Sequence, residues 1–334
     1  MKKVGVLTFH ASFNYGSMLQ AFALQRILEK LGYEPEIINF RTEKQKELYS
    51  YNRKLKSFKE IIRRILLFPY KKDLFKKQDK FEDFIKNYLY CTKEYSILDQ
   101  LKEENLGFDY YIVGSDQIWN TNCIDFDLAY LLPFVKNGKK IAYAPSLGPI
   151  NNNNDRILEY IKNFDYISVR EKQNFYSIEQ KLKKNFPSVL DPSLLLTKEE
   201  WLKYVSDKPL INYEYIFLYA PAYRKNILGL ATTLRKKYGL PIIISNIIGY
   251  RTLYFGNYIK CFNIGPLDFL NLIRNAKMVI SGSFHATLFS LLFEKEVITP
   301  NYEKDYRILT LMEKFNNINE ERKKSMKFLE EALQ

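Results

Sequence analysis

The 334-residue chain is 46% hydrophobic and 27% charged, a balance that excludes a disordered protein, and its length predicts two domains. No apolar run reaches the roughly 18 residues that cross a bilayer. The cysteines are widely spaced and form neither a zinc motif nor a disulfide framework: Cys91, Cys123 and Cys261. The net charge of +13 indicates an anionic partner, either nucleic acid, a membrane surface or a phosphorylated substrate.

The first half of the chain alternates predicted strands and helices. It begins with "MKKVGVLTFH", whose apolar stretch is too short for a secretory signal, so we predict a strand over 3–9 and a cytoplasmic protein. Helical apolar spacing over 16–32 ends at Gly32, a suitable C-terminal cap, and a strand follows at 34–40. Segments of crossover length separate the further predicted strands, which indicates a doubly wound parallel sheet. These strands are 108–116, 139–146, 165–171 and 188–196.

The second half repeats this alternation without visible sequence repetition. Helical stretches, such as 225–239 and 266–276, separate five more predicted strands: 215–220, 241–245, 259–264, 278–282 and 296–300. The fold class is therefore α/β, with two Rossmann-like domains in tandem, parallel sheets and ligands expected in the cleft between the domains. The predicted N-terminal domain covers 1–204 and contains a basic insertion at 41–80. The predicted C-terminal domain covers 205–304, and a charged helical tail covers 305–334.

The insertion carries 14 basic and five acidic residues. Within it, residues 53–72 place six apolar side chains on one helical face, with basic residues on the flanks and the opposite face: Leu55, Phe58, Ile61, Ile62, Ile65 and Leu66. This pattern is typical of a helix that lies on an anionic membrane, and it favours peripheral contact with the inner face of the cell membrane. The alternative is a helix whose apolar face packs on the core. We expect no nucleic-acid partner, because no recognisable nucleic-acid module is present.

Two turns in the first half carry candidate ligand-binding residues. The first lies between the first strand and helix, where polar groups and helix N-terminal amides suit an anion or a sugar hydroxyl: His10, Asn14, Tyr15, Gly16 and Ser17. The second lies at the end of the stretch 108–116 and just after it, and is dense in hydrogen-bonding side chains beside a Trp: Ser115, Asp116, Gln117 and Trp119. The alternatives are a plain strand–helix turn, and an N-capping Asp with a Trp that fills the core.

Two further turns carry a candidate cation and a candidate acid. Arg170 ends the apolar stretch "ISVRE" and suits a carboxylate or phosphate, or else a structural ion pair with Glu171 or Asp191. The stretch "ISGSFHATLFSLLF" covers 280–293. Ser281, Gly282 and Ser283 lie before a predicted helix there and are suited to bind an oxyanion. His285 is suited either to proton transfer or to a buried structural role.

Five stretches in this order together resemble the polysaccharide pyruvyl transferase family. They are "VGVLTFHASFNYGSMLQAFALQRILEKLGYEPEIINFR", "FDYYIVGSDQIWN", "ISVREK", "VLDPSLLL" and "ISGSFHATLFSLLFEKEVIT". The resemblance implies a GT-B-like fold, phosphoenolpyruvate as co-substrate, and a sugar of a surface polysaccharide or its lipid-linked precursor as acceptor. The implied product is a pyruvate ketal. Neither a metal nor a resident cofactor is expected.

The resemblance also suggests roles for individual residues. Family members are thought to hold the donor with an Arg in the "SVR" stretch and with the Arg and His of an "RxH" stretch, which correspond here to Arg170, Ser283 and His285. The second Arg is therefore missing, and candidates to replace it by position are Arg251, Lys277 and Arg307. We expect His285 to donate a proton, Asp116 to orient or deprotonate the acceptor, and the turn at 281–283 to hold phosphate.

The missing Arg keeps two other functions open. One is a nucleotide-sugar-dependent glycosyltransferase on the same fold, because a fold does not determine its chemistry. The other is a non-catalytic, membrane-associated glycan-binding protein.

Overall fold

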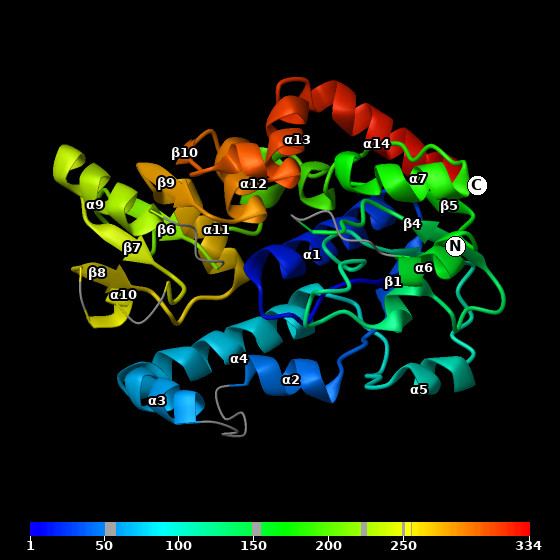
Figure 1. Ribbon diagram of the computed structural model, residues 1–334, viewed down its shortest axis with the longest axis horizontal. Helices are drawn as coiled ribbons and strands as arrows, with labels where there is room; N and C mark the ends of the chain where they lie inside the picture. Colours follow the sequence, from blue (N-terminus) through cyan, green and yellow to red (C-terminus); the bar gives the residue numbers. More distant parts are fainter. Residues whose placement is uncertain (51–57, 149–154, 222–225, 249–250, 255) are drawn as a thin grey trace. The chain divides into compact units, whose positions relative to one another are not determined.

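The structure is a computed structural model, and it describes residues 1–50, 58–148, 155–221, 226–248, 251–254 and 256–334. In this part of the chain, ten strands form two parallel sheets of five strands each (Figure 1). The chain divides into two compact units. The first comprises Met1–Leu48, Ile85–Leu196 and Glu303–Gln334, and the second comprises Tyr49–Phe84 and Thr197–Tyr302.

The first unit has the sheet order β2-β1-β3-β4-β5. Its strands are β1 (Lys3–Leu7), β2 (Glu34–Ile37), β3 (Tyr110–Val113), β4 (Lys139–Ala142) and β5 (Tyr166–Ile167). Its α-helices are α1 (Tyr15–Lys30), α2 (Glu43–Tyr49, which reaches the unit boundary), α5 (Leu98–Glu103), α6 (Asp155–Ile161), α7 (Tyr176–Leu182), α13 (Tyr306–Phe315) and α14 (Ile318–Ala332). Buried β3 reads "YYIV" without polar alternation, as a parallel strand covered on both faces does.

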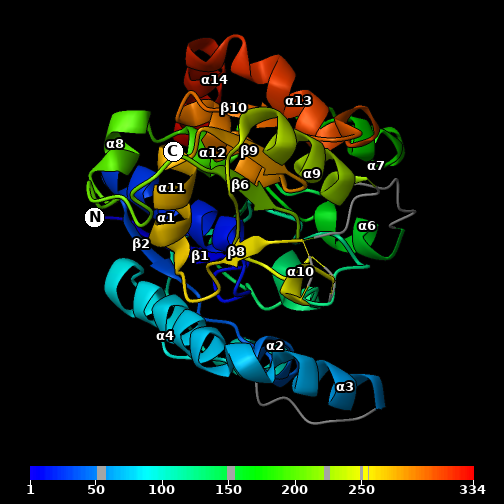
Figure 2. The same ribbon diagram turned by 90° about the vertical axis from the view of Figure 1, so that its left-hand side faces the viewer.

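The second unit has the sheet order β10-β9-β6-β7-β8. Its strands are β6 (Ile216–Tyr219), β7 (Ile242–Ile244), β8 (Tyr258–Lys260), β9 (Met278–Ser281) and β10 (Glu296–Ile298). Its α-helices are α3 (Phe58–Leu67), α8 (Lys198–Leu202), α9 (Ile227–Tyr238), α10 (Arg251–Tyr254), α11 (Pro266–Asn275) and α12 (Phe284–Leu292), and α4 (Lys71–Tyr88) crosses the unit boundary. Figure 2 shows α3 and α4 as successive helices.

The α/β prediction is confirmed, but the strand predicted at 188–196 was wrong. The described backbone there forms one isolated bridge, between Val169 and Ser188, and a short 3₁₀ turn at Pro192–Leu194. Pro192 has no amide hydrogen to give to a strand ladder, and the Asp191 side chain instead accepts a hydrogen bond from the Ser193 amide at 3.0 Å. Gly32 follows the end of α1 with φ +85°, as predicted for a glycine cap.

The insertion and the tail divide between the units in a way that the sequence did not indicate. Residues 49–84 cluster with the second unit, because Leu67, Tyr70 and Leu74 pack on its apolar core. The tail clusters with the first unit, where Ser325 Oγ accepts from the Leu190 amide at 2.9 Å and Arg322 donates to the Leu194 carbonyl at 2.7 Å.

No helix in the described ranges combines the length and the apolarity that crossing a membrane requires.

Candidate functional site

The turns after β1 and β3 meet at the carboxyl edge of the first sheet. The order of the strands reverses between these two neighbours, and such a switch point is where open α/β sheets bind ligands. Ser17 Oγ donates to Asp116 Oδ2 at 2.6 Å. Gln20 joins the same two turns, because its amide nitrogen donates to Thr8 Oγ1 at 2.8 Å and its amide oxygen accepts from the Ser115 backbone at 3.0 Å. The structure therefore brings the first two predicted turns together.

In the turn after β1, two of the predicted acceptor contacts make internal hydrogen bonds and a third is buried. His10 is fully buried, with Nδ1 3.2 Å from the Thr8 carbonyl and Nε2 2.9 Å from Asn39 Oδ1. Asn14 caps α1 by accepting a hydrogen bond from the Gly16 amide at 3.0 Å. Tyr15 is also buried. These contacts hold the turn and the start of α1, which is the alternative that the sequence left open for them.

The turn after β3 has a backbone conformation that requires the glycine at position 114. Gly114 has φ +112°, and a Cβ there would lie 2.0 Å from the Tyr143 carbonyl oxygen. Asp116, the next residue but one, has φ +69°, and its Oδ1 accepts from the Gln117 amide at 2.8 Å. Ser115 Oγ donates to the Ala144 carbonyl at 2.8 Å. Asp116 thus receives hydrogen bonds on both carboxylate oxygens.

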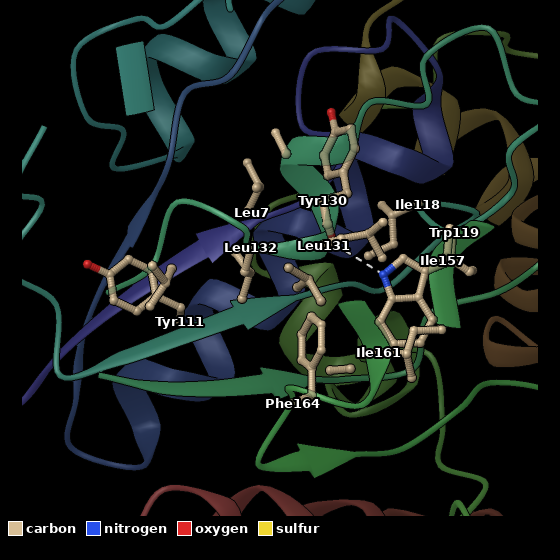
Figure 3. Close-up of a cluster of buried hydrophobic side chains, with 14 of the residues drawn as sticks. Leu7, Tyr111, Ile118, Trp119, Tyr130, Leu131, Leu132, Ile157, Ile161 and Phe164 are labelled. Atoms are coloured by element: carbon tan, nitrogen blue, oxygen red, sulfur yellow. Dashed lines mark hydrogen bonds between the residues drawn. The ribbon is translucent and has the colours of Figure 1, made fainter. Parts of the chain in front are cut away.

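Trp119 belongs to the core, not to a surface where a sugar could stack. Its side chain is completely buried, and its indole nitrogen donates to the Tyr130 carbonyl at 3.1 Å (Figure 3). Its ring meets Phe164 edge to face, with 5.5 Å between ring centroids. The prediction that Trp119 contacts the acceptor does not fit this position, because neither face of the ring is open.

Arg170 lies in a buried group of opposite charges, which we call the carboxylate cluster: Asp116, Arg170, Glu171 and Asp191. The guanidinium is 3.1 Å from Asp191 Oδ2, 3.4 Å from Glu171 Oε2 and 3.9 Å from Asp116 Oδ1. Arg170 is only 3% exposed. Three carboxylates around one guanidinium leave no excess positive charge for a donor anion, so the structural ion pair, and not the predicted anion clamp, describes Arg170 here.

Burial changes the ionisation of two groups at this cluster. Burial raises the pKa of Glu171, and the nearby Arg170 and the Ser146 hydroxyl, which donates to its carboxylate, offset only part of that rise. Burial also lowers the pKa of Lys314 to about 8. Its ammonium donates to the Val189 carbonyl at 2.7 Å. The cluster therefore contains a carboxyl that resists ionisation, and an amine that resists protonation lies next to it.

The turn after β9 occupies the corresponding switch point of the second sheet. The order of its strands reverses between β9 and β6, and residues 281–285 follow at the carboxyl edge. Ser281 Oγ accepts from the Ser283 amide at 3.0 Å, and the Gly282 amide donates to the Tyr219 carbonyl at 2.9 Å. These two amides already have protein acceptors, so the predicted phosphate cradle does not use them in this arrangement.

Ser283 and His285 begin α12. Ser283 is its N-cap, with Oγ 3.5 Å from the Ala286 amide. His285 is the second residue of the helix and is 6% exposed, and its ring meets Phe284 edge to face at 5.1 Å. The turn at 281–285 contains no charged residue of its own, so the positive end of the helix dipole is not neutralised within it.

Comparison with known proteins decides the family. The sequence model of the polysaccharide pyruvyl transferase family matches residues 14–303.

The chain belongs to this family.

No curated protein shows a significant sequence match to it.

Solved structures show the fold class of this family member. MnaA of S. aureus, solved with UDP, aligns with a TM-score of 0.55 at 12% identity, over 96% of this chain and 91% of that one. A Listeria monocytogenes protein assigned as a UDP-N-acetylglucosamine 2-epimerase aligns with a TM-score of 0.54 at 11% identity, over 97% and 90%. These neighbours are GT-B fold enzymes, and the chain shares that fold.

The three cations that the sequence offered in place of the expected second Arg are placed as follows. Arg307 lies in the first unit, where its Nη2 is 2.7 Å from Asp305 Oδ2. Lys277 lies in the second unit, 3.5 Å from Glu214. The side chain of Arg251 lies outside the described residues. Across the described residues, no group of three or more His, Cys, Asp or Glu side chains is arranged to hold a metal.

The sequence named Glu171 and Asp191 as alternative ion-pair partners of Arg170, but it did not indicate the contact of Asp191 with Ser115 or the role of Asn174. Asp191 accepts from both Arg170 at 3.1 Å and Ser115 Oγ at 3.1 Å. Asn174 donates to the Gly148 carbonyl at 2.6 Å and lies 3.4 Å from Glu171. The Asp-Pro pair in "VLDPSLLL" is a second signal that points to Asp191, since an Asp before a Pro commonly caps a turn.

Proposed function

We propose that this protein transfers pyruvate from phosphoenolpyruvate to a sugar of a surface polysaccharide or its lipid-linked precursor, forming a pyruvate ketal. The observation that carries the proposal is the family match over residues 14–303. The acceptor is a saccharide, phosphoenolpyruvate is a co-substrate, and nucleic acid has no role. With a lipid-linked acceptor, the reaction takes place at the inner face of the cell membrane.

The reaction requires an acid, a base and groups that bind anions. Protonation of C3 of the enol phosphate creates the methyl group and leaves C2 open to attack. One acceptor hydroxyl bonds to C2, a second hydroxyl closes the ring as the C2–O bond to phosphate breaks, and inorganic phosphate leaves. The two hydroxyls lose their protons in these steps.

We assign donor chemistry to the turn at 281–285. His285 is the proton donor, since it is the titratable side chain of that turn and begins a helix. The nine-residue helix α12 supports binding of the donor's phosphate or carboxylate at its N-terminus, because helix dipoles favour negative charge there. Ser281 and Ser283 add hydroxyl groups next to that end.

We assign the acceptor to the turn after β3 in the first unit. Asp116 receives hydrogen bonds from Ser17 and Gln117 and lies 3.9 Å from Arg170, so its carboxylate is held in one orientation. In that position it is the base that accepts a proton from an acceptor hydroxyl. Arg170 then acts through Asp116 and is a positioning residue, not the donor clamp.

Titration calorimetry with phosphoenolpyruvate tests the assignment of the donor. We expect saturable binding by the wild-type protein and an affinity at least about tenfold lower in His285→Ala, equivalent to about 1.4 kcal/mol. The control is Arg274→Ala, which removes a cation of the same unit whose partner Asp207 is exposed. This variant should bind like the wild type.

Release of phosphate from the donor when a saccharide acceptor is added, followed by ³¹P NMR, tests the reaction itself. Binding of a nucleotide sugar without binding of phosphoenolpyruvate would overturn the proposal in favour of a glycosyltransferase. Binding of a glycan without turnover of either donor would instead indicate a non-catalytic glycan-binding protein.

A further inference from the structure

Helix α3 and the residue after it present an apolar face to solvent. Five large side chains of this face are exposed, by 74% for Phe58, 69% for Phe68, 66% for Ile65, 42% for Ile61 and 40% for Ile62. We call this set the α3 face. In most surface helices such a stripe packs on the core. Contiguous apolar surface that remains exposed usually marks a binding surface. The core-facing alternative for this helix therefore does not describe these five side chains.

The opposite side of α3 is held by the second unit, which determines the direction in which the α3 face points. Leu67 lies nine residues after Phe58, about two and a half turns, and so is on the other side of the helix. Leu67 is 2% exposed and packs on the apolar core of the second unit.

Two hydrogen bonds support that anchor. Tyr70 donates to the Leu253 carbonyl at 2.9 Å, and Tyr254 of α10 donates to the Leu66 carbonyl at 2.5 Å. Figures 1 and 2 show α10 beside α3. Tyr254 is itself 48% exposed, so it extends the apolar surface next to the helix with an aromatic ring that also carries a polar group. Rings of this kind favour the boundary between water and lipid.

The charge around the α3 face selects its partner. Residues 58–72 contain five basic residues and one acidic residue. Lys71 and Lys72, which follow the face, are exposed. A second copy of the chain would bring these positive flanks together, and repulsion between like charges opposes such a contact. An anionic bilayer satisfies both features, since its acyl chains accept the apolar side chains and its head groups accept the cations.

We propose that the α3 face docks this protein on an anionic lipid bilayer. The helix lies in the plane of the membrane, with Phe58, Ile65 and Phe68 in the boundary between acyl chains and head groups. Residues 53–57, which the sequence pattern also assigned to this helix, lie outside the described residues. Lipid binding is an activity in addition to pyruvyl transfer, and neither donor nor acceptor is needed to observe it.

Co-sedimentation of the purified full chain with lipid vesicles tests the proposal. We expect the wild type to bind vesicles that contain phosphatidylglycerol much more tightly than vesicles of phosphatidylcholine alone. Binding should weaken as salt is raised, because salt screens the charges. The double variant Ile65→Glu/Phe68→Glu should lose at least about tenfold in affinity, since two charges would have to enter the boundary of the acyl chains.

A matched control variant introduces the same two charges at a different part of the surface. Ile97 and Ile124 are 56% and 54% exposed in the first unit, so Ile97→Glu/Ile124→Glu adds the same two charges away from the α3 face. This control should keep most of the wild-type binding. Thermal unfolding of each variant followed by circular dichroism should match the wild type, because all four replaced side chains are exposed.

Three outcomes would overturn the proposal. The first is that wild-type protein does not sediment with anionic vesicles. The second is that the α3-face variant and the control lose binding equally, which would indicate a general effect of charge. The third is a wild-type dimer in light scattering that the α3-face variant converts to a monomer, without an effect on vesicle binding. That result would assign the face to a second copy. None of these outcomes bears on phosphoenolpyruvate binding.

Discussion

Asp116 of the carboxylate cluster in the first unit and the turn at 281–285 of the second unit occupy corresponding places, each at the switch point of a five-stranded parallel sheet. Their chemistry differs. The carboxylate cluster places three acidic side chains around the buried guanidinium of Arg170. The turn at 281–285 contains hydroxyl groups and His285, with no charged residue.

This difference shows how one fold position serves two purposes. Ionised groups that leave water require partners, and once paired they resist movement. The carboxylate cluster is therefore suited to hold Asp116 and the surrounding backbone in one arrangement. A helix N-terminus without built-in charge keeps its positive potential for an incoming anion. We therefore expect residues of the first unit to affect stability most, and residues at the start of α12 to affect donor binding most.

The largest effect should follow from the loss of Arg170. In Arg170→Met, three carboxylates remain without their shared cation, and removing one partner of a buried ion pair costs about 3–5 kcal/mol of unfolding free energy. Urea denaturation of the variant and of the wild type measures this loss of unfolding free energy. Arg274→Met, which breaks a pair with exposed Asp207, should cost under about 1 kcal/mol.

The triple variant Arg170→Met/Glu171→Gln/Asp191→Asn should recover part of the loss, because two of the buried charges disappear together with their partner. An Arg170→Met protein as stable as the wild type would contradict the structural role of the cluster.

An intermediate effect should follow from substitutions at Ser283. Ser283→Ala removes the N-cap of α12 and should cost about 1 kcal/mol of unfolding free energy. Ser283→Arg loses the same cap but introduces the cation that the family resemblance implies at this position. It should therefore bind phosphoenolpyruvate about tenfold more tightly than Ser283→Ala in calorimetry. Equal affinities of the two variants would show that the side chain at 283 does not reach the donor.

The smallest effect is a pH dependence that originates at Glu171. Its pKa is raised above the ordinary value of 4.5, so the folded state holds this proton more tightly than the unfolded state does. Its contribution to stability is complete below pH 4.5 and is lost as pH rises through the raised pKa. Glu171→Gln keeps a neutral group there, and its stability should decrease less over that pH range.

Urea midpoints measured from acid to neutral pH compare Glu171→Gln with the wild type. The control is Glu159→Gln, which makes the same chemical change at a side chain that is 77% exposed. The same pH profile for wild type and Glu171→Gln would mean that burial of Glu171 has no effect on its ionisation.

The sequence by itself determined the fold class and the positions of the turns. Apolar runs of strand length alternate with helical spacing, and each sheet follows from this pattern because parallel strands need long crossovers. The family stretches also located Asp116, Arg170 and His285 a few residues after the ends of strands. What the pattern could not supply is the neighbour of each side chain. Trp119 reads equally well as a sugar platform or as core, and only its contacts with Phe164 and Tyr130 distinguish them.

Tertiary structure decided which charged groups have a partner of opposite charge and which apolar side chains face solvent. Arg170 and Asp191 are 21 positions apart, so their ion pair depends on how two loops approach and not on local spacing. The periodicity of α3 groups Phe58, Ile61 and Ile65 on one side, but does not say whether that side meets protein or water. Packing of Leu67 on the second unit settles the direction of the helix, because burying one side of a helix leaves the opposite side exposed.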